Sequence, residues 1–204
     1  MKKIIIAVEE LIRQKGIDNI EISEIAKKSG YSISKILNYF GNEEYLIAFG
    51  CIYYINFYVE DIVKYIDGGT SLDRYKKNYE IFNEYAFKYP EIFYKLYYTD
   101  INKKLDYIIK ICFELFPEYY EEKTSVFKNC LINQANIKIR EYEMLLNLAK
   151  EDYIKIENID KISEILRRIH LSYLLQAENS DDLYDVDKMN NEFLKCFDFI
   201  FENI

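Results

Sequence analysis

Glycine, proline, histidine and tryptophan are scarce in this chain of 204 residues, which contains six Gly, two Pro, one His and no Trp. So few helix-breaking residues, together with little strand-type alternation, predict an all-α protein. The length is sufficient for a hydrophobic core in one or two domains. With a single histidine, the sequence offers no recognisable Ser/His/Asp or Cys/His arrangement, and no phosphate-binding glycine loop is found. We therefore expect that the protein is not an enzyme.

Cysteine is also sparse. The four cysteines, Cys51, Cys112, Cys130 and Cys196, lack the spacing of metal ligands or of a redox pair. Each lies in an apolar helical pattern, which predicts buried free thiols in a reducing compartment. We expect no metal and no other cofactor.

Long hydrophobic runs are missing as well. The uncharged stretch Tyr45–Val59 has fifteen residues, fewer than the roughly twenty that cross a bilayer. Residues 1–6 resemble the start of a signal peptide, but Glu9 and Glu10 interrupt the apolar region too early for export. These features predict a cytoplasmic protein with no membrane partner, and a long buried helix from Glu43 to Ile66.

The N-terminal segment carries three short helical patterns. In the first, apolar residues recur at helical spacing from Ile4 to Ile12 and are followed by Gly16. The second has Ile22, Ile25 and Ala26 on one face. Gly30 then permits a turn, and Ser32 is a suitable N-cap for a third helix that reaches about Phe40. Two short helices separated by such a turn are typical of a helix-turn-helix, which places its second helix in the major groove of DNA.

This pattern resembles the DNA-binding domain of the TetR family of bacterial transcriptional regulators. The resemblance covers about the first quarter of the chain. It is carried by the first helix with Gly16, by Ile25-Ala26, Gly30-Tyr31-Ser32 and Tyr39-Phe40, and by Glu44-Tyr45-Leu46. It implies a helix-turn-helix DNA-binding domain at residues 1–46, with the motif at about 21–40, and a helical effector-binding and dimerisation domain at residues 47–204.

Several residues of the second and third helices have side chains that suit DNA. Asparagine pairs with adenine and lysine with guanine in the major groove, while hydroxyl groups and lysines contact phosphates. The candidate DNA-binding residues are Lys27, Lys28, Ser32, Ser34, Lys35, Asn38 and Tyr39.

Four positions depart from the family pattern. Glu21 stands where a capping threonine is usual, and Ser34 stands where a small residue, often glycine, opens the third helix. Leu37 replaces a tyrosine that is common in the family, and Glu43 replaces a lysine. Residues 1–46 hold seven basic and seven acidic residues, so the whole net charge of −8 resides in the remainder of the chain. Both features weaken the expected attraction to phosphate.

The body of the chain is divided into further helices by Gly68-Gly69, Pro90 and Pro117. The last two predicted helices, Lys161–Glu178 and Val186–Asn203, are apolar over a wide face. The resemblance implies that such helices pair across a two-fold axis, whereas packing within one chain is the alternative. The candidate dimer residues are Ile165, Ile169, Tyr173, Phe193, Phe197 and Ile200.

Aromatic residues are abundant in the middle helices. Such stripes usually form a core, but bodies of TetR-like proteins enclose an effector pocket, so we expect a small apolar or aromatic effector. The candidate pocket residues are Phe82, Tyr97, Phe113, Phe127, Asn133, Gln134, Arg167 and His170.

These observations predict a ligand-responsive transcriptional regulator, a repressor, that binds a palindromic operator in double-stranded DNA as a homodimer. The alternative is a TetR-like helical sensor or partner-binding protein in which DNA binding is weak or lost.

Overall fold

The computed structural model describes residues 1–55, 58, 61, 68–119, 137–180 and 184–203, and every regular element within these ranges is a helix. The predicted all-α class is confirmed for this part of the chain. Within the same ranges, each helix is too short or too polar to cross a membrane.

The chain forms two compact units, each built from two separate stretches of sequence. The first comprises residues 1–57 and 95–136, and the second comprises residues 58–94 and 137–204. The predicted domain boundary after residue 46 falls within helix α4 (Glu43–Tyr54). The division into residues 1–46 and 47–204 stays a prediction.

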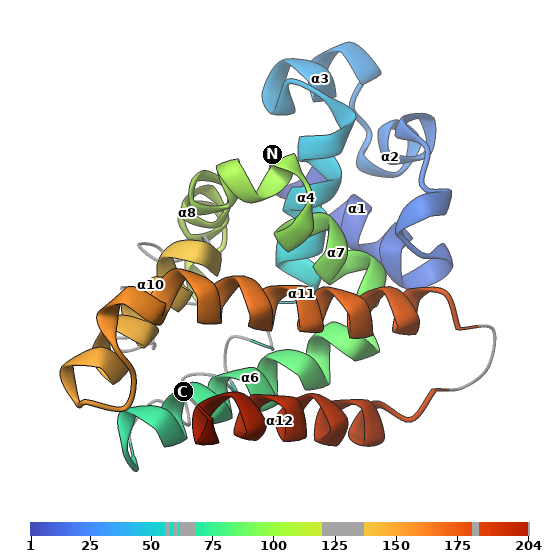
Figure 1. Ribbon diagram of the computed structural model, residues 1–204. Coiled ribbons are helices and arrows are strands. Elements are labelled where there is room, and N and C mark those ends of the chain that lie inside the picture. The colour runs from blue at the N-terminus through green and yellow to red at the C-terminus, as the bar shows by residue number, and fades with distance from the viewer. Residues whose placement is uncertain (56–57, 59–60, 62–67, 120–136, 181–183, 204) are drawn as a thin grey trace. The chain divides into compact units, whose positions relative to one another are not determined.

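The first unit contains the N-terminal helices and a group of elements that follow much later in the sequence (Figure 1). Helix α7 (Pro90–Tyr98) starts in the second unit and ends in the first. The other described elements of the first unit are α1 (Lys2–Lys15), η1 (Ile17–Asn19), α2 (Ile22–Ser29), α3 (Ile33–Phe40), α4, η2 (Asp100–Lys104), α8 (Leu105–Leu115) and η3 (Pro117–Tyr119).

Helices α1 and α4 form the centre of the first unit. Their backbones approach closely at Gly50, where an added Cβ would lie 2.8 Å from Cβ of Val8. The ring of Phe49 meets that of Phe40 edge to face, with centroids 5.2 Å apart, and this contact ties α3 to α4. At the other end of α4, Tyr53 stacks on Phe116 at 4.4 Å. The N-terminal helices therefore share one core with α8.

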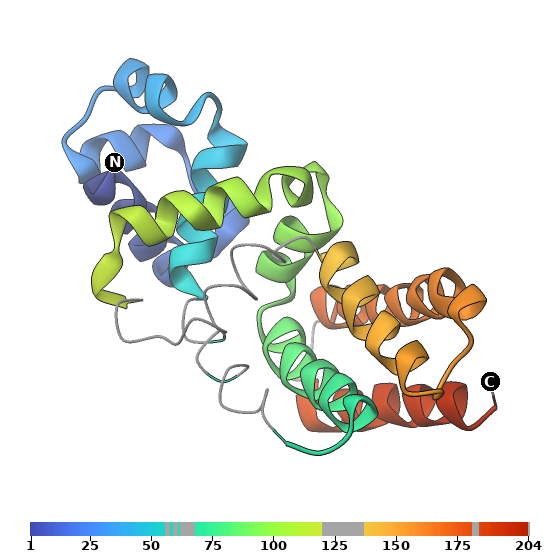
Figure 2. The same ribbon diagram turned by 90° about the vertical axis from the view of Figure 1, so that its left-hand side faces the viewer.

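The second unit is a helical bundle, and both ribbon views show its four long helices gathered together (Figures 1 and 2). These helices are α6 (Ser71–Lys88), α10 (Ile137–Lys150), α11 (Ile159–Glu178) and α12 (Val186–Glu202), with the short η4 (Ile156–Asn158) before α11. Fully buried Tyr75, Leu166, Phe193 and Phe197 belong to one hydrophobic cluster at the centre of the bundle.

Most predicted helix boundaries agree with the structure to within a few residues. The predicted helix Glu43–Ile66 is described only in part, since α4 ends at Tyr54 and residues 62–67 lie outside the described ranges. Cys51 and Cys112 are buried free thiols, as predicted, whereas Cys196 is half-buried. Cys130 lies outside the described residues.

Candidate functional site

The turn between α2 and α3 is built from two local signals. Gly30 adopts a left-handed conformation with φ of 76°, and its N–H donates to the carbonyl of Ala26 at the end of α2. Ser32 then caps α3, because its hydroxyl oxygen accepts the backbone N–H of Lys35 at 3.3 Å. Only two residues, Tyr31 and Ser32, separate Gly30 from the first residue of α3, so the directions of the two helices are set locally.

Helix α2 starts at a carboxylate rather than a hydroxyl. Glu21 is the N-cap residue, and its backbone N–H donates to Oε2 of Glu24 at 3.1 Å. The hydroxyl of Ser23 donates to the carboxylate of Glu21 at 3.1 Å. Glu24 also pairs with Lys15, and the hydrogen bond from this lysine lowers the pKa of the Glu24 carboxyl. Two acidic residues, Glu21 and Glu24, therefore form the cap at the N-terminus of α2.

All seven candidate DNA-binding residues have exposed side chains. Ile36 and Phe40, by contrast, are buried and attach α3 to the unit. The exposed residues are Lys27, Lys28, Ser32, Ser34, Lys35, Asn38 and Tyr39. The exposed parts of α2 and α3 therefore carry hydroxyl, amide and ammonium groups.

The lysines and arginine of this region are largely occupied by carboxylates of the same unit. Lys28 pairs with Glu10 at 2.8 Å, and Arg13 pairs with Glu9. Lys2 and Lys15 pair with Glu118 and Glu24. Among the described carboxylates, none pairs with Lys3, Lys27 or Lys35. The ammonium of Lys35 lies 5.0 Å from the centroid of the Tyr31 ring, a cation–π contact.

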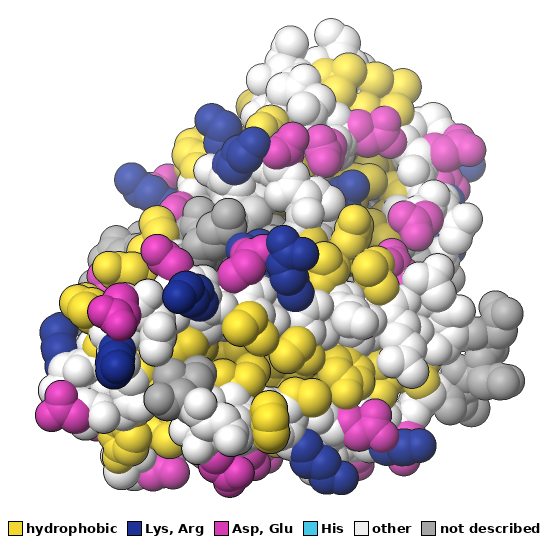
Figure 3. Space-filling model, viewed as in Figure 1, with side chains coloured by type: hydrophobic (Ala, Val, Ile, Leu, Met, Phe, Trp, Pro, Cys, Tyr) yellow, Lys and Arg dark blue, Asp and Glu magenta, His cyan; other side chains and the backbone are white. Residues whose placement is uncertain are grey.

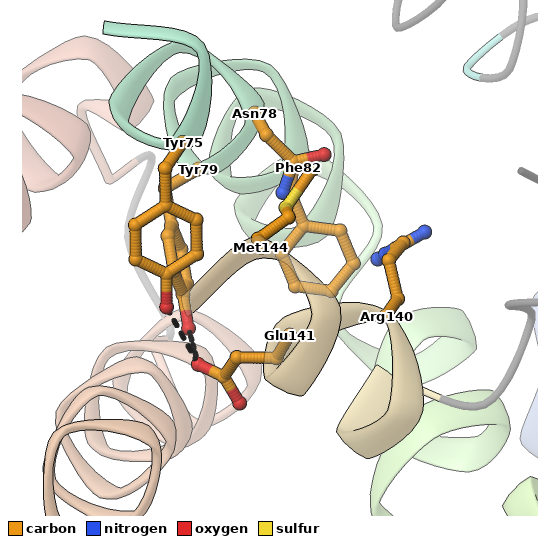
Figure 4. Close-up of a pocket in the computed structure, with 7 residues that line it drawn as sticks. All are labelled: Tyr75, Asn78, Tyr79, Phe82, Arg140, Glu141 and Met144. Carbon is orange, nitrogen blue, oxygen red and sulfur yellow. Dashed lines mark hydrogen bonds between the residues drawn. The ribbon is translucent and has the colours of Figure 1, made fainter. Parts of the chain in front are cut away.

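The second unit contains a small pocket between α6 and α10, which Figure 4 shows. The cavity has a volume of about 10 Å³, enough for roughly one water molecule. An aromatic ring is larger, so the lining side chains would have to move to admit one. The pocket is lined by Tyr75, Asn78, Tyr79, Phe82, Arg140, Glu141 and Met144.

Glu141 is the centre of a polar network at this pocket. Its Oε1 accepts hydrogen bonds from the hydroxyls of Tyr75, at 3.1 Å, and Tyr79, at 2.5 Å (Figure 4). Its Oε2 accepts one from Ser163 of α11 at 2.7 Å. Burial raises the pKa of the Glu141 carboxyl, whereas the three hydroxyl donors and the charge of Arg167 lower it in part. One carboxylate therefore connects α6, α10 and α11.

The structure brings together three of the eight candidate pocket residues. The ring of His170 lies 4.8 Å from that of Phe82, and Arg167 precedes it by one turn of α11. His170 is fully buried among aromatic rings, and burial lowers its pKa to about 3, so it is neutral at physiological pH. Tyr97 and Phe113 belong to the first unit, while Phe127, Asn133 and Gln134 lie outside the described residues.

The candidate dimer residues divide into two groups. Phe193 and Phe197 are buried in the core of the second unit, which corresponds to the alternative of packing within one chain. Ile165 is 46% exposed, and Ile169, Tyr173 and Ile200 are half-buried. A band of apolar side chains runs along α11 and α12 on the face seen in Figure 3.

Arg140 and Glu141 were not among the candidate pocket residues, although both are buried beside the pocket. A signal for Glu141 was present. It precedes buried Leu145 and Leu148 by four and seven residues, so a charged residue occupies the apolar face of α10.

Comparison with known proteins identifies no relative, because no family model, no curated protein and no solved structure matches this chain. Among the described residues, no group of three or more His, Cys, Asp or Glu side chains could hold a metal ion.

Proposed function

We propose that this protein is a DNA-binding transcriptional regulator of the TetR-like kind, a repressor that binds a palindromic operator as a homodimer in the cytoplasm. The observation that carries the proposal is the exposure of Lys27, Ser34, Lys35 and Asn38 on two short helices joined by the turn at Gly30. Two short helices with this connection suit a recognition helix that lies in the major groove.

A homodimer is part of the proposal because a single copy offers little charge. Lys3, Lys27 and Lys35 are the cations of the N-terminal helices without an ion-pair partner in the described part of the chain. Two copies would present six such lysines and two recognition helices, and they would reach half-sites about 34–36 Å apart.

The second unit is proposed to receive the effector, a small apolar or aromatic molecule. Its aromatic residues around Phe82 and His170 support this assignment. The effector would shift the population between forms that fit the operator and forms that do not. Because the cavity beside Phe82 has a volume of about 10 Å³, such a molecule would have to displace Met144 or another lining side chain.

A second function, a helical sensor that binds DNA weakly or not at all, is favoured by a separate observation. The carboxylates of Glu21 and Glu43 are exposed near the proposed phosphate-binding surface, and Lys28 is held by Glu10. These acids would repel the phosphate backbone.

Selection of bound sequences from random double-stranded DNA tests the proposal and gives the operator. With that operator, Lys35→Ala combined with Asn38→Ala is expected to weaken binding more than about a hundredfold, because each base contact contributes roughly 1–3 kcal/mol. Circular dichroism should show an unchanged helical content. Lys104→Ala, which removes another exposed lysine of the first unit, is the control and should leave affinity nearly unchanged.

The salt dependence of binding separates the two candidate functions. If six lysines each neutralise one phosphate, the slope of log K against log salt concentration is expected to be about −5. If no DNA sequence is selected and binding does not depend on salt concentration, the sensor function is favoured.

A further inference from the structure

The outward surface of α3 has an unusual composition for a helix that contacts DNA. At about 100° per residue, Ser34 and Asn38 form one stripe on the side away from buried Ile36 and Phe40. Lys35 is the one cationic residue among the eight of α3, Ile33–Phe40.

Ile33 lies beside this polar stripe and is 41% exposed. It is the first residue of α3, next to the capping residue Ser32, so its position is fixed by the start of the helix. Leu37, one turn later on the same side, is half-buried. The two branched side chains form an apolar stripe adjacent to the hydroxyl and amide of Ser34 and Asn38. Figure 3 shows apolar side chains among uncharged, white atoms at the place of α3 in this view.

Lys35 lies on the other side of the polar stripe, with its ammonium over the ring of Tyr31. Lys35 could donate to guanine, whereas Asn38 suits adenine. The apolar side chain of Ile33 suits the methyl group of thymine. Asn38 lies five residues after Ile33, on the neighbouring stripe, and each of the two side chains favours an A·T base pair.

We infer that α3 reads A·T base pairs, with the amide of Asn38 bound to adenine and the side chain of Ile33 packed against the C5-methyl group of a thymine. This inference rests on the proposed function. It assigns Ile33, which the sequence did not single out, as a residue that determines specificity, and it predicts A·T pairs at the bases that α3 contacts.

The test uses the full-length protein and the operator found by selection, with individual thymines replaced by deoxyuridine. This replacement removes only the methyl group. At the thymine that contacts Ile33, we expect wild-type affinity to fall about fourfold, as for the loss of one buried methyl group. Ile33→Ala should bind the unmodified operator more weakly than wild type and should no longer respond to deoxyuridine at that position.

Ile139→Ala is the matched control, since Ile139 is 48% exposed on α10 in the other unit. It should respond to deoxyuridine as wild type does, and circular dichroism establishes that both variants are folded. Specific binding with no sensitive thymine, or the same sensitivity in Ile33→Ala, would overturn the inference and leave the proposed function standing. Absence of any sequence-specific binding would overturn both.

Discussion

Among individual residues, Glu141 has the least expected environment. Its side chain is buried, yet it accepts three hydrogen bonds from hydroxyl groups and lies near the positive charge of Arg167. A buried carboxyl group is costly when charged unless such partners compensate. Its raised pKa indicates that burial outweighs the compensation. The network therefore stabilises the bundle best when this carboxyl is protonated.

The pH dependence of stability tests this view with Glu141→Gln. Because the native pKa is raised above the ordinary 4.5, the contribution of Glu141 is fully present below that pH and is lost as pH rises through the native pKa. Glutamine is always neutral, and it can accept from Tyr75 and Tyr79 while donating to Ser163. Near pH 4 we expect the variant and wild type to differ by less than about 1 kcal/mol. As pH rises, the variant should become progressively the more stable of the two until the difference levels off.

Urea unfolding at a series of pH values measures that difference. Glu143→Gln removes an exposed carboxylate from the same helix and should show no comparable trend. A difference between Glu141→Gln and wild type that stays constant with pH would show that Glu141 is ionised equally easily in both states.

Residue positions differed in how far sequence could predict them. Asn38 and Lys35 were expected to be exposed because they lie opposite Ile36 and Phe40 on a short helix, and periodicity determines this. The partners of Glu141 could not be predicted, since Tyr75 and Ser163 reach it from helices distant in the sequence. Likewise, the pairing of Lys28 with Glu10 depends on how α1 and α2 pack.

At the scale of helices, Gly50 is the residue that allows α1 and α4 to approach. It lies inside α4, where glycine costs about 1 kcal/mol relative to alanine, and its position against Val8 explains its presence. Gly50→Ala would drive a methyl group into Val8, and overpacking typically costs about 1–3 kcal/mol. We expect the crowding to exceed the gain in helix propensity, so the free energy of unfolding should fall by about 1–2 kcal/mol.

A double-mutant cycle with Val8→Ala separates these two effects. Shortening Val8 removes its two γ-methyl groups but leaves its Cβ 2.8 Å from the new methyl group. Gly50→Ala should therefore be less harmful in that background, though still destabilising. Chemical denaturation of the four proteins provides the measurement. Stabilisation by Gly50→Ala alone would mean that propensity dominates and that the two helices separate easily.

Helix boundaries were more predictable than helix partners. Gly30, Gly41 and Pro90 mark ends and starts through backbone preferences that need no tertiary information, and the structure places boundaries there. The packing of α8 beside α4, seen in the stacking of Tyr53 on Phe116, joins segments about sixty residues apart. No local pattern encodes such a contact.

At the scale of the whole molecule, the proposed homodimer accounts for apolar surface that the second unit leaves uncovered. Ile165 and Phe199 are 46% and 67% exposed on α11 and α12, although Phe193 and Phe197 are already buried by their own chain. Exposed apolar side chains are typical of an interaction surface where they gather on one face, and Figure 3 shows a band of apolar side chains along α11 and α12. A second copy of the same face would satisfy two-fold symmetry.

Analytical ultracentrifugation of wild type and Ile165→Glu tests this proposal. Wild type should sediment as a dimer, whereas a carboxylate at an apolar interface should weaken association by about tenfold or more. Operator affinity should fall with it, because one recognition helix supplies half the contacts. Ile156→Glu is the matched control, since Ile156 is 67% exposed on η4 and should leave both properties unchanged. If wild type is a monomer that binds a single half-site, the exposed face of α11 serves another partner. If Ile165→Glu leaves the dimer intact, the two-fold axis lies elsewhere on the chain.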